Sequence, residues 1–125
     1  MTTLIYHCSL ITDWAAAQQV GTYTISSRGR TLEQEGFVHA SYAGQVAGVL
    51  DRFYADLTEP LCLLTIDRDL LDVPLVRENL MGGTELFPHI YGPVPAVAVV
   101  EVVELTRTDD GWNWPDAPVL SETDQ

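Results

Sequence analysis

The sequence is poor in basic residues and in cysteine. Six lysine and arginine residues stand against eighteen aspartate and glutamate residues, which gives a formal net charge of -12. This charge repels the phosphate backbone of nucleic acids and anionic lipid surfaces, so we expect neither as a partner. The 2 cysteines, Cys8 and Cys62, each lie inside an apolar run. That setting favours free buried thiols over a disulfide framework.

The sequence also has no basic segment at its start and no long apolar run. The first apolar stretch is broken by His7 and Ser9, so we expect no signal peptide. No window reaches the ~18 to 20 apolar residues that a membrane-spanning helix requires. Together with free thiols, which a reducing compartment maintains, these features predict a cytoplasmic protein without a membrane partner.

The apolar content is sufficient for one packed domain. At 125 residues, with 46% hydrophobic and 19% charged residues, the chain has the composition of an ordinary globular protein. We assign residues 1–106 to this domain and residues 107–125 to an acidic carboxy-terminal tail. Trp112 and Trp114 are expected to pack the first part of the tail on the domain.

Apolar patterns predict both strands and helices, and therefore an α+β fold. Strands are expected at residues 4–8, 36–41, 61–66, 73–76 and 96–105. Thr12 offers an N-cap for a helix that Gly21 ends. Apolar residues at intervals of three and four predict a second, amphipathic helix over residues 46–57. The polar stretch 26–35 is predicted to be a loop, and prolines exclude a helix across residues 87–95.

Two of the three histidines lie in the same short pattern, His-x-Ser, on predicted strands. Alternate residues of a strand share a face, so His7 points with Ser9, and His39 points with Ser41. Each pair places an imidazole beside a hydroxyl near the start of a helix, where an anion is favoured. Cys8 falls on the opposite face from His7, which favours core packing over a role as a nucleophile.

The third histidine lies in a segment that prolines and a glycine make rigid. This segment displays the carboxylate of Glu85, the imidazole of His89 and the phenol of Tyr91. Rigid loops that mix polar and aromatic groups suit ligand recognition. A second polar loop carries Arg28 and Arg30, and its two cations can hold one anionic ligand.

Together these motifs resemble a bacterial family, domain of unknown function 952, over roughly residues 4–105. The resemblance is carried by Tyr6-His7-Cys8-Ser9, Glu35-Gly36-Phe37-Val38-His39-Ala40-Ser41, Gln45-Val46, Phe53-Tyr54, Leu63-Leu64-Thr65-Ile66-Asp67 and Phe87-Pro88-His89-Ile90-Tyr91-Gly92-Pro93. That family is grouped with the ADP-ribosyltransferase-like superfamily. The resemblance implies a small single domain with a split, mostly antiparallel β-sheet, two main flanking helices and a cleft for NAD.

The resemblance also implies contacts between the first two motifs and NAD. In the superfamily, a histidine of the first core strand contacts the adenosine-side ribose of NAD, and His7 with Ser9 is similar. The residue beside the nicotinamide corresponds to His39. Ser41 then precedes the helix that the superfamily has at this point.

A late glutamate completes the site that the resemblance implies. Its carboxylate stabilises the oxocarbenium-like ribose as nicotinamide leaves. Glu85 is the first candidate and Glu78 the second. His89 can replace the acid by binding a phosphate or the leaving group. On this hypothesis the protein is a glycosyltransferase or glycohydrolase, NAD is its substrate or ligand, and no further cofactor is required.

Two other functions are open at this point. The first is a noncatalytic module of the same fold that binds a nucleotide, ADP-ribose or another phosphorylated metabolite. The second is a metal site built from His7, His39 and His89, because three imidazoles with an open position form catalytic zinc sites. No two of these histidines have the short spacing typical of a metal-ligand pair.

Overall fold

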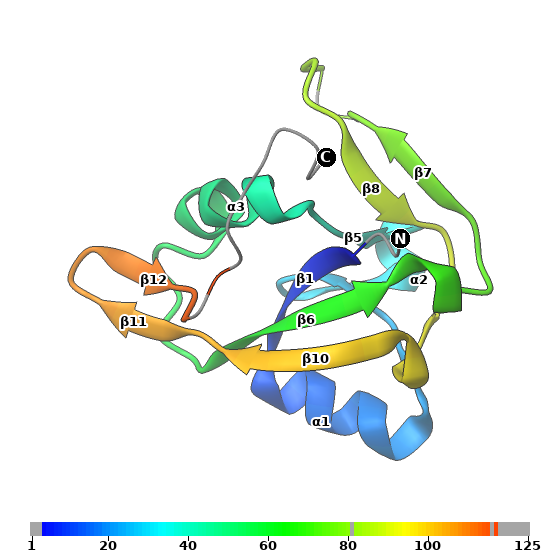
Figure 1. The fold of residues 1–125 in the computed structure, drawn as a ribbon, viewed down its shortest axis with the longest axis horizontal. Helices are drawn as coiled ribbons and strands as arrows, with labels where there is room; N and C mark the ends of the chain where they lie inside the picture. Colours follow the sequence, from blue (N-terminus) through cyan, green and yellow to red (C-terminus); the bar gives the residue numbers. More distant parts are fainter. Residues whose placement is uncertain (1–3, 81, 116, 118–125) are drawn as a thin grey trace.

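The computed structural model describes residues 4–80, 82–115 and 117, and most of its elements are strands. Two sheets of three strands are built from β1 Leu4–Leu10, β5 Val38–His39, β6 Leu61–Asp67, β7 Leu75–Glu78, β8 Phe87–Ile90 and β10 Val99–Glu104. The strand orders are β1-β6-β10 and β5-β8-β7 (Figure 1). All pairings within them are antiparallel. The chain is a small α+β domain with mostly antiparallel strands, as expected.

Two helices cover opposite faces of the β1-β6-β10 sheet (Figure 1). They are α1 (Ile11–Val20) and α3 (Val46–Phe53). Successive residues of a strand point to opposite faces. Ile5 accordingly belongs to the core cluster that contains Trp14 of α1, whereas Tyr6 belongs to the cluster on the α3 side. The core therefore has two layers, one on each side of the sheet.

Among the residues that the structure describes, the two sheets meet at a single backbone bridge. Tyr6 and Ser41 exchange both amide-to-carbonyl hydrogen bonds, at 2.8 and 2.7 Å. This bridge lies on the outer edge of β1, because β6 occupies the other edge. Within the described residues β1 has no further ladder with β5. Space can therefore open beside β1 beyond the bridge.

Both main helices differ at one end from the prediction. The N-cap of α1 is Leu10 rather than Thr12, because β1 continues, paired with Leu61, up to that residue. Its C-cap is Gly21 with a φ of 97°, as predicted. The second helix ends at residue 53 instead of 57, although Leu57 remains buried.

The stretch 26–35 is not the loop that its polarity predicted. It holds β3 (Ile25–Ser27), β4 (Arg30–Thr31) and α2 (Leu32–Glu35). A tight turn at Gly29, with a φ of 72°, joins the two strands. A capping box between Thr31 and Gln34 then starts α2. Polar residues with good turn and cap geometry can thus form short elements without an apolar pattern.

Two predicted strands begin later than expected. The strand β7 starts at Leu75, because Pro74 has no amide hydrogen to donate to the ladder. The strand predicted over 96–105 begins with a 3₁₀ turn at Ala96–Ala98, and β10 starts at Val99. The proline-rich segment before it contains no helix, as predicted. It forms β8 and then β9 (Val94–Pro95), which pairs with β2 (Thr22–Tyr23).

The first part of the acidic tail lies against the domain. It forms a hairpin of β11 (Thr106–Thr108) and β12 (Gly111–Asn113). The indole of Trp112 donates a hydrogen bond of 2.8 Å to the Tyr54 carbonyl, and the Trp114 ring lies 5.1 Å from the Tyr6 ring. The rest of the tail, residues 116 and 118–125, lies outside the described residues. In the described ones, no helix has the length and apolar character to cross a membrane.

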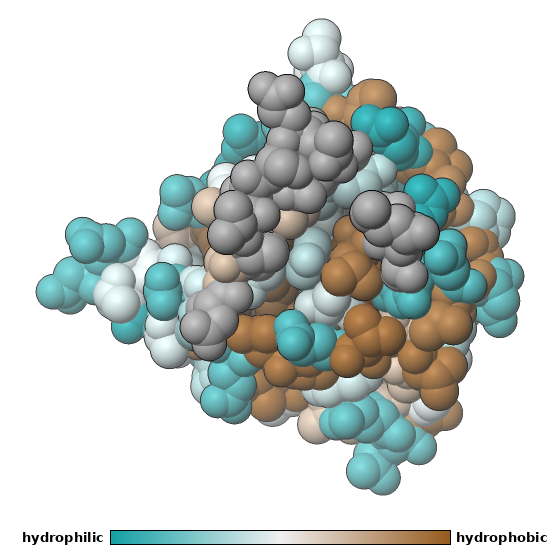
Figure 2. All heavy atoms as spheres, in the orientation of Figure 1, coloured by the Kyte–Doolittle hydropathy of each residue, from teal (hydrophilic) through white to brown (hydrophobic). Residues whose placement is uncertain are grey.

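Apolar side chains gather over β10 in the view of Figure 2. Val100 and Val102 are exposed on this strand, which forms one edge of its sheet. Glu101 and Glu104 of the same strand are also exposed. Charged residues on an edge strand oppose unwanted pairing with other strands.

Candidate functional site

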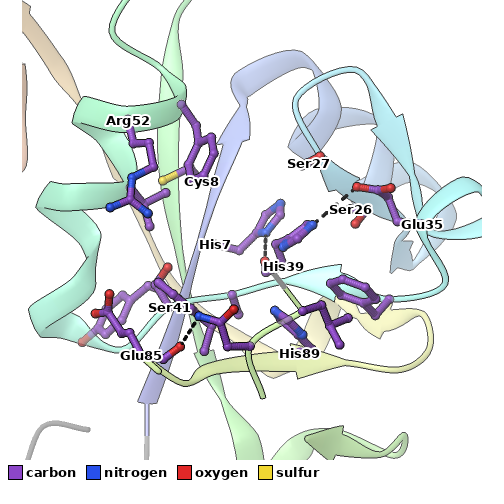
Figure 3. Close-up of a pocket in the computed structure, with 18 of the residues that line it drawn as sticks. His7, Cys8, Ser26, Ser27, Glu35, His39, Ser41, Arg52, Glu85 and His89 are labelled. Atoms are coloured by element: carbon purple, nitrogen blue, oxygen red, sulfur yellow. Dashed lines mark hydrogen bonds and ion pairs between the residues drawn. The ribbon is translucent and has the colours of Figure 1, made fainter. Parts of the chain in front are cut away.

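A cleft of about 980 Å³ opens beside β1, near the Tyr6–Ser41 bridge. Its walls come from β1, β3, α3, β5 and β8 and from the segment that precedes β8 (Figure 3). This volume is at the upper end of the range for small-molecule sites. The predicted site residues that line it are His7, Arg28, His39, Ser41, Glu85 and His89. Ser9 and Tyr91 do not line it.

Two histidines and a phenylalanine form a contact cluster in this cleft. His39 and His89 are direct partners across β5 and β8, so both side chains project from the same face. Their ring centroids lie 5.3 Å apart. Phe37 stacks on His89 at 4.2 Å and meets His39 edge-on at 4.6 Å. Strand alternation predicts that Phe37 shares a face with His39, but the sequence did not indicate that Phe37 contacts both histidines.

Each of these histidines has a carboxylate neighbour. Glu35 lies 3.5 Å from Nε2 of His39, and Glu78 lies 2.9 Å from Nδ1 of His89. The Tyr91 hydroxyl donates to the same oxygen of Glu78. These hydrogen bonds, first from Tyr91 and then from His89, lower the pKa of Glu78 below its usual value. The shared carboxylate in turn raises the pKa of Tyr91.

The imidazole of His39 favours its neutral form. Burial lowers its pKa, the nearby His89 lowers it further, and Glu35 opposes both effects. The side chain still keeps 42% of its surface exposed. His39 therefore presents a neutral ring to the cleft near pH 7.

Glu85, the first candidate for the catalytic acid, lies in the cleft. Its carboxylate accepts a hydrogen bond of 3.2 Å from Nε2 of Gln45. Gln45 is 4% exposed, and its amide also binds the Leu86 carbonyl at 2.8 Å and the Tyr42 amide at 3.0 Å. These bonds fix the segment that carries Glu85 against the start of α3. Glu78, the second candidate, contacts Nδ1 of His89 but does not itself line the cleft.

The structure gives His7 and Ser9 internal partners. Nδ1 of His7 donates to the His39 carbonyl at 2.5 Å, and the Tyr23 hydroxyl donates to Nε2 at 2.8 Å. Burial lowers the pKa of His7 to about 4. Ser9 is 2% exposed and donates to the Leu10 carbonyl. A ligand in the cleft finds no free ring nitrogen on His7, which instead supports the backbone of His39.

No metal centre is assembled from the three histidines. Because both nitrogens of His7 are engaged, it cannot join His39 and His89 around an ion. Within residues 4–80, 82–115 and 117, no group of three His, Cys, Asp or Glu side chains has the geometry to hold a metal.

The two arginines that line the cleft differ in whether a carboxylate pairs with them. Arg28 donates to the Phe53 carbonyl at 3.1 Å and to Asp56 at 2.7 Å, so its charge is already paired. Arg52, which sequence analysis did not single out, also lines the cleft and lies 5.8 Å over the Phe53 ring. It forms no salt bridge with any described residue. The sequence placed Arg52 on the polar face of the predicted amphipathic helix, and this position could have indicated that it is free to bind a ligand.

A buried hydroxyl is also present in the cleft wall. Ser26 is fully buried, and its Oγ has no hydrogen-bond partner among the described residues. It lies in β3 opposite α3, close to Ser27 (Figure 3). Sequence analysis did not identify Ser26, because a single serine in a polar segment gives no sign that it will be buried.

Comparison with known proteins identifies the family. The family model described as "Protein of unknown function (DUF952)" matches residues 8–102. The chain belongs to this family. The match confirms that part of the expected resemblance, whereas the grouping with ADP-ribosyltransferase-like proteins stays a prediction. No curated protein matches this DUF952 chain.

A solved protein shares the fold of this DUF952 chain. The X-ray crystal structure of protein CC0527 from Caulobacter crescentus has a TM-score of 0.74 and 28% sequence identity. The similarity covers 87% of this chain and 91% of CC0527. The solution NMR structure of CC0527 has a TM-score of 0.70, with 28% identity and coverage of 87% and 90%. The described fold is therefore also that of an experimentally determined relative.

Proposed function

We propose that the cleft binds NAD or a related ligand with an ADP-ribose moiety and promotes the loss of nicotinamide. The observation that carries the proposal is the meeting of Glu85, His39 and His89 in one cleft of about 980 Å³. A cleft of this size accommodates a ligand larger than a mononucleotide. The resemblance to ADP-ribosyltransferase-like domains supports the same ligand class.

The proposed reaction needs a carboxylate near the reacting sugar. The bond between ribose C1′ and the nicotinamide nitrogen breaks, and its electron pair leaves with nicotinamide. Positive charge then develops on the ribose, and the carboxylate of Glu85 stabilises it. Water or another hydroxyl adds to C1′ and gives up its proton to a base. With water, the products are ADP-ribose, nicotinamide and a proton.

Arg52 supports the choice of a phosphorylated ligand. A protein with a net charge of -12 repels anions, so an anionic ligand requires a local cation. Of the two arginines in the cleft, Arg28 is paired with Asp56, whereas Arg52 forms no salt bridge in the described structure. The guanidinium of Arg52 is therefore the proposed contact for the diphosphate.

A noncatalytic binding module is the second candidate. It is favoured by the engagement of His7, whose ring nitrogens both bind protein groups. The ribose contact that the superfamily resemblance implies would then be absent. On this alternative, the cleft binds the ligand but lacks a group that the reaction needs.

Titration with NAD separates these functions. We expect NAD to shift the imidazole NMR signals of His39 and His89 and to be converted to nicotinamide in the same sample. Glu85→Gln should bind NAD but release no nicotinamide, while the exposed control Glu101→Gln should behave as the wild type. Binding without release in the wild type favours the noncatalytic module. If NAD shifts neither imidazole, the proposed ligand is wrong.

A further inference from the structure

Glu78 lies outside the cleft but contacts a residue inside it. In the antiparallel register, Glu78 is opposite Phe87, and Val76 is opposite His89. Residues 87 and 89 share a face of β8, so Glu78 is the diagonal neighbour of His89 on that face. Its Oε1 lies 2.9 Å from Nδ1 of His89. The pairing of β7 and β8 thus holds the carboxylate against one edge of the imidazole.

The same oxygen of Glu78 also accepts the Tyr91 hydroxyl. Tyr91 follows His89 by two residues, so the carboxylate is held between two donors from one chain segment. Glu78 is largely shielded from solvent, with 23% of its side chain exposed. Its position is therefore set by the fold and not by a ligand.

This arrangement selects one tautomer of His89. An ionised carboxylate only accepts hydrogen bonds, so Nδ1 of His89 must carry the hydrogen. In the neutral ring, Nε2 then has an unprotonated lone pair. Nε2 makes no hydrogen bond with any described residue, and His89 lines the cleft between Phe37 and His39. The lone pair is therefore available to a ligand in the cleft, whose wall includes His89 (Figure 3).

We propose that Glu78 is a positioning residue that makes His89 the proton acceptor of the cleft. This inference rests on the proposed function and assigns His89 a role other than binding a phosphate or the leaving group. Nε2 of His89 takes a proton from the attacking water while the oxygen forms a bond to ribose C1′. The bond from C1′ to nicotinamide breaks with its electron pair on the nitrogen, and His89 later returns its proton to solvent. Glu78 stabilises the imidazolium formed in between.

The other imidazole of the cleft is less suited to this role. The contact between His39 and Glu35 is 3.5 Å, which is long for a hydrogen bond. It joins Nε2 of His39 to Oε1 of Glu35, whereas the second donor to Glu35 binds the other carboxylate oxygen, unlike the oxygen of Glu78 that His89 and Tyr91 share. This second donor is Arg30, at 3.3 Å. His39 therefore remains the residue beside the leaving group.

The tautomer of His89 can be measured without any ligand. In nitrogen-15 NMR spectra near pH 7.5, we expect wild-type His89 to be protonated at Nδ1 and unprotonated at Nε2. His89→Gln identifies the signals. Glu78→Ala should give a mixture of tautomers, whereas the control Glu101→Ala should leave the wild-type pattern. Protonation at Nε2 in the wild type, or an unchanged tautomer in Glu78→Ala, overturns the inference.

Kinetics of nicotinamide release provide the second measurement. We expect Glu78→Ala to lower kcat by about 10²- to 10⁴-fold with little change in KM, because only the proton transfer is affected. Glu78→Gln, which is isosteric, should also lower kcat, since the charge is lost and the amide no longer only accepts hydrogen bonds. An unchanged kcat in both variants overturns the assignment. A wild type that shows the Nδ1 tautomer but releases no nicotinamide would refute the proposed function and leave the positioning by Glu78 supported.

Discussion

Acidification from about pH 7.5 to about pH 5 is expected to destabilise the fold mainly through His7. The folded-state pKa of His7 is about 4, whereas its ordinary value is 6.5, because burial disfavours the charged ring. Between these values the unfolded chain binds a proton that the folded chain does not. Stability therefore falls as the pH falls through this window.

The size of this effect follows from the two pKa values. At about pH 5 the unfolded His7 is almost fully protonated and the folded one almost fully neutral, so the free energy of unfolding drops by about 2 kcal/mol relative to pH 7.5. The lowered pKa of His39 adds an effect of the same sign. For a domain of this size, 2 kcal/mol is a substantial fraction of the total stability.

Urea unfolding curves at the two pH values measure the effect. The matched variant is His7→Asn, whose amide can still donate to the His39 carbonyl but does not titrate. We expect this variant to be less stable than the wild type at about pH 7.5 and to lose about 2 kcal/mol less on acidification. An equal loss in both proteins would show that His7 is not the titrating group. A His7 imidazole signal that titrates near pH 6.5 would refute the reasoning directly.

Three further outcomes are expected. Gly92→Ala should destabilise the fold by about 1 to 3 kcal/mol in urea unfolding, because the added Cβ would lie 2.4 Å from Cγ1 of Val73. Leu50→Ala should cost about 2 to 5 kcal/mol, since this side chain is 2% exposed in the core beside α3. Cys8 and Cys62, whose pKa values burial raises to about 12 and about 11, should react with a thiol reagent only after unfolding. Reaction of either thiol at the same rate in native and denatured protein would contradict this.

The elements that follow an apolar pattern could be predicted from the sequence. The strand from Leu61 and the helix from Val46 were expected because their apolar periods match the faces that they bury. The hairpin around Gly29 was missed because it is stabilised by turn geometry and by the Thr31 cap rather than by an apolar face. Boundaries set by tertiary pairing, such as the extension of β1 to Leu10, were also outside the reach of local patterns.

Several candidate residues lie together in the structure, but the sequence did not predict their partners. Motif and alternation placed His39, Glu85 and His89 on segments that the structure brings to one cleft. The bond between Glu78 and His89 depends on the register of β7 and β8, and a shift of one residue would move Glu78 to the other face. Sequence alone does not fix that register, because no residue of β7 is fully buried.

The two His-x-Ser motifs show how burial gives one pattern two roles. His7 lies on a strand whose faces are both covered, and the Tyr23 hydroxyl reaches its outer nitrogen, so it is held neutral inside the core. His39 lies on a strand of two residues at the cleft, and nearly half of its side chain is exposed. The hydrogen bond from His7 to the His39 carbonyl joins the motifs. Because this bond fixes the backbone from which the His39 ring projects, we expect the first motif to influence a ligand through the second motif.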